Sequence, residues 1–367
     1  MNSVMKKICR HLFGHMDGFL LLIITALLII GLAILYSASD QNMERVMYQV
    51  INIIVALIVM WVFSLIPPQQ LSRFALPIYI LGLILLLAVS IHGEVRLGAR
   101  RWLNLGITSI QPSELMKIAV PMMLAWYLDK PEAELRLKDF AVASLFLVLP
   151  VILILKQPDL GTALIIFASG FFVLFLAGLS WRIMGGFMLA FTAMIPLIWR
   201  HMHDYQRQRI LTLFHPAQYR LGAGYHIIQS TIAMGSGGFF GQGWLHGTQA
   251  KLDFLPERST DFIFAVFSEE FGFAGILMLV LLFVLLIWRC LVISVNAPTL
   301  FTRLLAGSIT LTFFTYAFIN MAMVSGILPV VGIPLPLISY GGTSIVTLLL
   351  GFGILMSINI HRKLVQT

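Results

Sequence analysis

Carboxylates and a lysine that could do chemistry lie next to long apolar stretches. Glu114 and Lys117 are three residues apart, so on a helix they share one face. Such a pair either neutralises itself inside a helix bundle or acts on a polar substrate. Asp159 precedes another apolar run, where it could cap a helix, hold a cation or bind a sugar hydroxyl.

Asp261 is the last residue of a long polar stretch and is followed by the apolar sequence Phe262–Phe267. One interpretation is a first-turn acid favoured by the helix dipole, with Ser259 or Thr260 as the N-cap. The other is a general base placed where a lipid-borne substrate would meet the protein. The local sequence alone favours the first interpretation.

Arginines gather beside these carboxylates. Arg100 and Arg101 precede Trp102, and Arg207 and Arg209 lie in the polar stretch. Guanidinium groups suit phosphate and carboxylate ligands. The alternative is that they reach toward ordinary anionic lipid headgroups. Because arginines outside the membrane oppose the positive-inside bias, we favour a lipid-linked anion for the adjacent pair.

The elements that position these residues are membrane-spanning helices. Of 367 residues, 59% are hydrophobic and only 11% are charged, which is typical of a polytopic membrane protein. About 20 apolar residues cross a bilayer. The sequence predicts an all-α fold of about ten transmembrane helices, near 17–37, 47–66, 76–92, 113–128, 140–155, 160–178, 183–199, 262–288, 304–324 and 343–360.

An even number of spans puts both termini on one side of the membrane. The basic residues near the two ends predict that this side is the cytoplasm: Lys6, Lys7, Arg10, Arg362 and Lys363. We expect one integral membrane domain over 1–367, with 201–261 as a large extracytoplasmic loop between the seventh and eighth helices. Cys9 and Cys290 then lie on the cytoplasmic side, as free thiols.

The polar stretch has its own pattern. Tyr225–Met234 has apolar residues at helical spacing and could lie along the membrane surface. The glycine-rich sequence Gly235–Trp244 follows no strand, which argues against a phosphate-binding loop and suggests flexible backbone near a ligand or partner. At 1.5 Å per residue, Glu269 and Glu270 are expected roughly 12–14 Å deeper than Asp261, as structural residues inside the bundle of which at least one is paired or protonated.

A resemblance to a known family enters near the end of the chain. Asn320, Gly326–Pro329, Gly332, Ile333 and Leu337–Ser344 resemble the signature of the SEDS family (shape, elongation, division and sporulation). The likeness extends to Gln111–Glu114, Gln157–Thr162, Gly224–Ser230 and Asp261–Val266. Within the family, His203–Arg209 and Gly243–Thr248 are most similar to the elongation branch, with the division-specific branch as the alternative.

This resemblance implies a peptidoglycan glycosyltransferase of a bacterial inner membrane, which polymerises lipid II, the undecaprenyl-pyrophosphate-linked disaccharide peptide. It also implies that Asp261 is the general base and that Glu114 and Lys117 line the same cavity. The other expected substrate-binding residues are Arg100, Arg101, Gln111, Asp159, Arg207 and Arg209. No metal ligand is assigned, and a divalent cation (Mg²⁺ or Mn²⁺) stays open as a cofactor.

The resemblance also implies partners. These are a class B penicillin-binding protein transpeptidase and the rest of the elongation machinery, and no nucleic acid is expected. Two other functions compete: a lipid II flippase, and a scaffold that only recruits synthases. A flippase needs charge along the whole crossing, whereas most ionisable groups here gather at one end, so we favour the glycosyltransferase.

Overall fold

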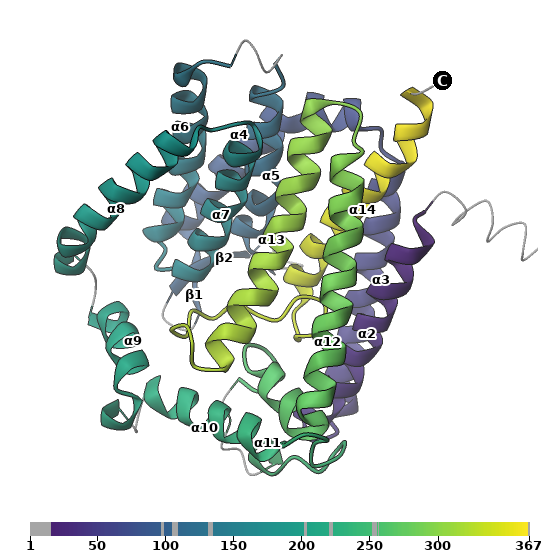
Figure 1. The fold of residues 1–367 in the computed structure, drawn as a ribbon, viewed down its shortest axis with the longest axis vertical. Coiled ribbons are helices and arrows are strands. Elements are labelled where there is room, and N and C mark those ends of the chain that lie inside the picture. Colours follow the sequence, from purple (N-terminus) through teal and green to yellow (C-terminus); the bar gives the residue numbers. More distant parts are fainter. Residues whose placement is uncertain are drawn as a thin grey trace, which may run out of the picture.

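The computed structural model describes residues 16–96, 99–104, 109–130, 135–201, 204–219, 223–251, 255 and 257–365. Over these residues the protein is a bundle of long helices (Figure 1). The long helices are α2 (Gly18–Ala38), α3 (Met43–Leu65), α4 (Pro68–His92), α5 (Pro112–Tyr127), α6 (Leu137–Leu155), α7 (Leu160–Leu176), α8 (Trp181–His201), α12 (Ile263–Val295), α13 (Leu300–Val324) and α14 (Gly342–Val365).

All ten predicted apolar runs are helical, which confirms the predicted all-α membrane fold. Seven helices in the described part are long and apolar enough to cross a membrane unaided: α2, α3, α4, α6, α12, α13 and α14. The central helices α5 and α13 bury most of their residues, whereas α3 and α4 expose large apolar side chains along one side. Polar residues on α5 and α13 therefore face the bundle interior.

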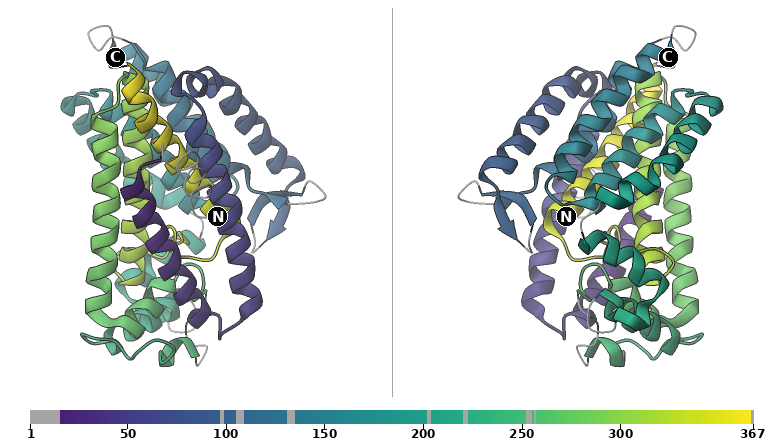
Figure 2. Two further views of the ribbon diagram at one scale, coloured as in Figure 1. Left: turned by 90° about the vertical axis from the view of Figure 1, so that its right-hand side faces the viewer. Right: turned by 90° about the vertical axis from the view of Figure 1, so that its left-hand side faces the viewer.

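One small sheet interrupts the helical pattern between α4 and α5. Strands β1 (Glu94–Arg96), β2 (Ala99–Asn104) and β3 (Ser109–Ile110) form an antiparallel sheet in the order β1-β2-β3. It projects from the side of the bundle (Figure 2). These strands were not predicted from the sequence, because they are short and rich in arginine.

The start of α2 and the end of α14 lie at the same end of the bundle, called here the terminal end. Asp17 caps α2 by accepting from the Leu20 N–H at 3.0 Å. Its other oxygen accepts from Arg289 on α12 at 2.5 Å and from Asn359 on α14 at 3.1 Å. One carboxylate thus joins three helices. Cys9, Lys6, Lys7 and Arg10 lie outside the described residues, and Cys290 is a buried free thiol.

The opposite end, called the loop end, carries the polar stretch. It contains α9 (Asp204–Phe214), a 3₁₀ turn η2 (Pro216–Tyr219), α10 (Ala223–Ser236) and α11 (Thr248–Lys251). Helix α8 leads away from the bundle, and α9, α10 and α11 follow one another across its loop end (Figure 1). The predicted helix over Tyr225–Met234 is confirmed as part of α10.

The glycine-rich segment packs tightly against α12, which bends sharply at Gly272 (φ 62°, ψ −163°). Phe273 and Ala274 donate their N–H groups to the carbonyls of Gly238 and Phe239, at 3.0 and 2.9 Å. The expectation of flexible backbone at Gly235–Trp244 was therefore wrong. These glycines allow two backbones to approach closely, a role for which a missing Cβ is needed.

Glu269 and Glu270 are buried and hydrogen-bonded, as predicted, but not deep in the bundle. Glu269 accepts from the N–H and hydroxyl of Thr248 at 2.7 and 3.0 Å, and Glu270 accepts from Ser37 in the last turn of α2. Both carboxylates therefore lie at the loop end. The inferred depth was wrong because the helix axis changes direction at Gly272.

A substitution at Gly241 tests this packing. A Cβ there would lie 2.1 Å from the carbonyl oxygen of Glu270, and the backbone has φ +83°. We expect Gly241→Ala to destabilise the fold by roughly 2 to 3 kcal/mol, measured as a lower midpoint of thermal unfolding in detergent. The control is Gly235→Ala, where no atom lies within 4 Å of the added Cβ. An equal midpoint for the two variants would contradict the role given to Gly241.

Candidate active site

The segment that carries Asp261 is held by residues near the end of the chain, within the stretches that resemble the family signature. Tyr340 donates its N–H to the Ser259 carbonyl at 2.9 Å, and the Ser339 hydroxyl donates to the Thr260 carbonyl at 2.6 Å. The Asn320 amide donates to the Asp261 carbonyl at 2.9 Å. Three successive carbonyls are thus fixed by three separate donors.

This arrangement differs from a helix cap. Helix α12 begins at Ile263, and its N-cap is Phe262, which makes no side-chain cap hydrogen bond. The expectation that Ser259 or Thr260 caps the helix was wrong. Asp261 lies in the turn before the helix, and its orientation depends on the three contacts from α13 and the α13–α14 connection.

Asp261 faces a cavity of about 640 Å³. A Cβ on Gly332, which has φ +73°, would lie 3.4 Å from the Asp261 carboxylate, so the chain passes close to the acid. The lining combines six of the predicted site residues with others: Arg101, Trp102, Gln111, Glu114, Lys117, Asp159, Gly161, Thr162, Ile165, Thr260, Asp261, Tyr316, Gly332, Ile333, Pro334, Tyr340, Gly341, Gly342, Thr343 and Ser344.

The surroundings of Asp261 favour its protonated form more than water would. Burial raises its pKa from the ordinary value of 3.8 to about 6, and the negative charge of Glu257 adds to this rise. The positive charge of Arg209 acts in the opposite direction. A carboxyl group with a pKa just below neutrality is mostly ionised at pH 7 and is a stronger base than an ordinary aspartate.

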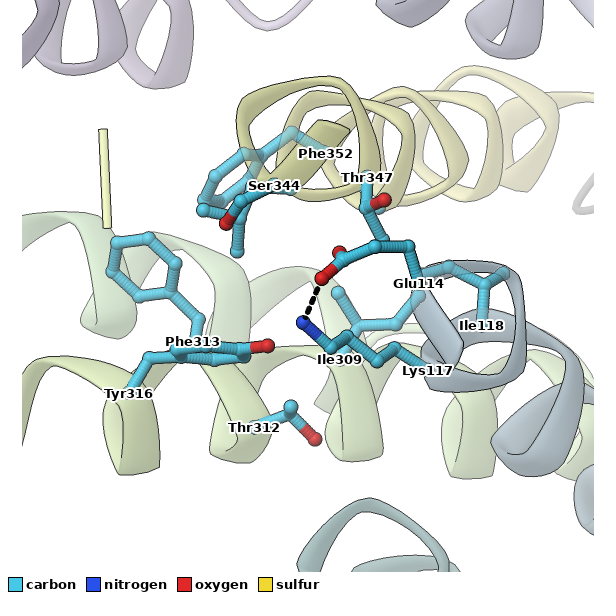
Figure 3. A pocket seen from close by; sticks show the side chains of 12 residues that line it. Glu114, Lys117, Ile118, Ile309, Thr312, Phe313, Tyr316, Ser344, Thr347 and Phe352 are labelled. Atoms are coloured by element: carbon cyan, nitrogen blue, oxygen red, sulfur yellow. Dashed lines mark hydrogen bonds and ion pairs between the residues drawn. The ribbon is translucent and has the colours of Figure 1, made fainter. Parts of the chain in front are cut away.

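Glu114 and Lys117 form a buried ion pair on α5, as their spacing predicted. Lys117 Nζ lies 2.5 Å from Glu114 Oε1 and 5.1 Å from the centre of the Tyr316 ring on α13. Figure 3 shows the three side chains meeting between α5, α13 and α14. Tyr316 was missed by the sequence analysis. The available signal was its position one helical turn before Asn320, on the same face of α13.

Asp159 serves one of the roles that its sequence left open, that of a helix cap. One oxygen accepts from the Thr162 N–H at 3.2 Å and so caps α7. The other accepts from Gln111 at 3.3 Å and lies 3.5 Å from Arg101 Nε. Arg101 also donates to the Pro158 carbonyl at 2.7 Å. The cap therefore presents an amide and a guanidinium at the cavity wall.

Three predicted residues are not among those that line the cavity. Arg207 donates to the carbonyls of Trp199 and Arg200 at the end of α8, at 2.9 and 2.8 Å. The positive charge of Arg209 lowers the pKa of Asp261. The backbone of Arg100 pairs with Val95 in the sheet, but its side chain lies outside the described residues.

An apolar groove of about 470 Å³ adjoins the cavity. It runs between α3, α4, α5 and α14 and is lined mostly by aliphatic residues, including Leu71, Ile78, Met122 and Leu350. Gln111, Glu114, Gly342 and Thr343 line both the groove and the cavity. A polar space and a lipid-like space therefore meet at the start of α5.

The described residues do not form a group of three or more His, Cys, Asp or Glu arranged to hold a metal ion. In the cavity, Glu114 is paired with Lys117, and Asp159 is engaged by Gln111, Arg101 and the Thr162 N–H. Asp261, the third carboxylate of the cavity, is influenced by the charges of Glu257 and Arg209.

Comparison with known proteins decides the family. The cell cycle protein family FTSW_RODA_SPOVE matches residues 17–364. The chain belongs to this family. It is 50% identical to the peptidoglycan glycosyltransferase MrdB of Escherichia coli K12 over 353 residues, which cover 96% of this chain and 95% of that protein. This match confirms the predicted class of enzyme, a peptidoglycan glycosyltransferase.

Solved structures of family members have the same fold. One, described as structural coordination of polymerization and crosslinking by a peptidoglycan synthase complex, has a TM-score of 0.82 and 32% identity, covering 95% of this chain and 98% of that one. The rod shape determining protein RodA of Thermus thermophilus has a TM-score of 0.72 and 29% identity, covering 95% and 97%. The predicted likeness to the elongation branch is confirmed.

The buried ion pair gives a test that is independent of catalysis. Lys117→Met leaves the Glu114 carboxylate without its countercharge, and we expect it to destabilise the protein by roughly 3 to 5 kcal/mol. Glu114→Gln leaves the ammonium unpaired and should also destabilise. The double variant should recover most of the loss, measured by thermal unfolding in detergent. Additive losses in the double variant would show that the two residues do not stabilise each other.

Proposed function

We propose that this glycosyltransferase polymerises lipid II with Asp261 as the general base. The observation that carries the proposal is the shared cavity. A carboxylate with a raised pKa and two cationic side chains, Lys117 and Arg101, line one space that opens onto an apolar groove. A sugar joined to a lipid through a pyrophosphate needs these three environments together.

The reaction is an inverting displacement. The 4-hydroxyl of the acceptor sugar attacks C1 of the donor sugar, its proton passes to Asp261, and the bond from C1 to the pyrophosphate breaks. Developing charge on the departing pyrophosphate is stabilised by Lys117 and Arg101, which are already oriented by Glu114 and Asp159. Direct displacement needs no covalent sugar intermediate, and a single basic carboxylate suffices.

The apolar groove supports a lipid-linked substrate. Its lining is aliphatic along α3, α4, α5 and α14, and it reaches the polar cavity at Gln111 and Glu114. A prenyl chain in the groove would place the attached pyrophosphate near Lys117. The lipid thus enters from within the bilayer while its sugars stay in the wet part of the site.

The membrane orientation and the partners follow from the same function. We propose both termini in the cytoplasm of a bacterial inner membrane, one integral membrane domain over 1–367, and 201–261 as its extracytoplasmic loop. The similar synthase complex coordinates polymerization with crosslinking. We therefore propose a class B penicillin-binding protein transpeptidase as the partner, within the elongation machinery.

A flippase is less well supported than it was by the sequence. The deep charges on which a translocation path would depend were Glu269 and Glu270, and both lie at the loop end among residues of the polar stretch. Labelled lipid II in vesicles distinguishes the three functions. An enzyme yields polymer, a flippase moves the lipid across the bilayer, and a scaffold does neither.

Loss of the base gives the direct test. Asp261→Asn keeps the shape of the side chain but cannot accept a proton, so we expect polymerisation of lipid II to fall roughly 10²- to 10⁴-fold. Thermal unfolding should show an intact fold, because the three contacts to residues 259–261 go to backbone carbonyls. The rate is measured in liposomes with the partner transpeptidase present. A folded variant that polymerises at the wild-type rate would remove Asp261 from catalysis.

The pH dependence provides a second test. A base acts only when deprotonated, so kcat/KM should rise with pH through a midpoint near 6, the pKa of Asp261, and level off above it. Glu257→Gln removes the neighbouring negative charge and should move the midpoint to lower pH. Arg209→Gln should move it to higher pH.

These profiles are recorded with the wild type and both variants at constant ionic strength. The readout is the position of the midpoint and not the height of the plateau, because either substitution can also affect substrate binding. If the midpoints of the two variants do not move in opposite directions, the rise of kcat/KM with pH does not report the ionisation of Asp261.

A further inference from the structure

A second cavity lies next to Asp261, beside the segment that carries it. It has a volume of about 440 Å³ and is lined by Arg45, Leu255, Glu257, Arg258, Ser259, Thr260 and Tyr340. Thr260 and Tyr340 also line the cavity of Asp261. The two spaces therefore share a wall that ends at the proposed base, and the function proposed above leaves the second one unused.

The lining of the second cavity is polar and of mixed charge. Arg45 donates to the Ser259 hydroxyl at 3.2 Å, Arg258 is paired with Asp40, and Glu257 accepts from the Thr260 hydroxyl at 2.9 Å. Two guanidinium groups and one carboxylate thus line the cavity, and one of the guanidinium groups has a further carboxylate partner in Asp40. In the proposed reaction Lys117 and Arg101 of the first cavity serve the pyrophosphate, which leaves the second cavity for another part of a substrate.

This mixture suits a sugar. Each hydroxyl of a pyranose both donates and accepts, so its binding site needs donors and acceptors side by side. Arg45 and Arg258 supply donors, Glu257 supplies an acceptor, and Thr260 supplies a hydroxyl that does both. The Ser259 hydroxyl is engaged within the protein, by Arg45 and by the Ala38 carbonyl. The same guanidinium groups also match the carboxylates of a peptide attached to the sugar.

We propose that the second cavity binds the saccharide of the acceptor substrate. This inference rests on the proposed function and deepens it. The cationic cavity and its apolar groove hold the donor through its pyrophosphate and lipid, and the acceptor saccharide approaches Asp261 from the other side of the shared wall. Arg45, in the first turn of α3, is then a residue that selects for the acceptor.

Steady-state kinetics of a single condensation, between two blocked substrates, test this assignment. A lipid II analogue whose terminal 4-hydroxyl is capped serves only as donor, and one with a non-cleavable phosphonate at C1 serves only as acceptor. We expect Arg45→Gln to raise the KM of the acceptor roughly tenfold, the loss of about one charge-assisted hydrogen bond. The KM of the donor should stay unchanged.

Two further variants separate recognition from support of the wall. Ser259→Ala removes the Arg45–Ser259 hydrogen bond but keeps the guanidinium, so it should raise the acceptor KM much less than Arg45→Gln does. Arg182→Gln, an exposed arginine at the start of α8, is the control and should match the wild type. An equal rise in Ser259→Ala, an equal effect on both substrates, or an unchanged acceptor KM in Arg45→Gln would each overturn the proposal.

The proposed function fails separately. If wild-type protein forms no product from the two analogues together, the proposed polymerisation is wrong. If Asp261→Asn forms the product at the wild-type rate, the base assignment is wrong. If both of these controls behave as expected and only the Arg45 variant lacks a selective effect, the second cavity is not the acceptor site.

Discussion

Three hydrogen bonds to consecutive carbonyls determine the geometry of the whole site. Tyr340 donates to the carbonyl of Ser259, Ser339 to that of Thr260, and Asn320 to that of Asp261. The Asn320 amide also donates to the Ile333 carbonyl at 2.6 Å. The α13–α14 connection, which contains Gly332, is therefore held by the same side chain as Asp261. Because backbone carbonyls are held, the side chain of Asp261 stays available for chemistry.

The site also requires charged side chains inside the bundle, each with a partner of opposite charge. Lys117 and Arg101 each have a carboxylate partner, and neither partner is Asp261. Buried charges without partners are strongly destabilising. The pairs Lys117–Glu114 and Arg101–Asp159 therefore let cations persist beside the apolar groove, while burial raises the pKa of Asp261 to about 6.

Much of this architecture was predictable because hydrophobicity is a strong local signal. The ten apolar runs, the helical face shared by Glu114 and Lys117, and the cap at Asp159 all follow from local spacing. The errors came from contacts between distant segments. Nothing local to Gly272 shows that the glycine-rich segment will pack on it, and Tyr316 belongs to the site only because α13 lies beside α5. The guanidinium of Arg207 could bind an anion, but it donates to the carbonyls of Trp199 and Arg200 at the end of α8.

The order of the three carbonyl contacts along the chain affects when the protein can work. Each donor follows its acceptor in the sequence, by 59 residues for Asn320 and by 79 for Ser339. During synthesis Asp261 is therefore added to the chain well before Asn320, Ser339 and Tyr340, which hold its backbone. An unfinished chain that ends before Ser339 lacks two of the three donors, so the backbone beside Asp261 is fully held only once nearly the whole chain has been made.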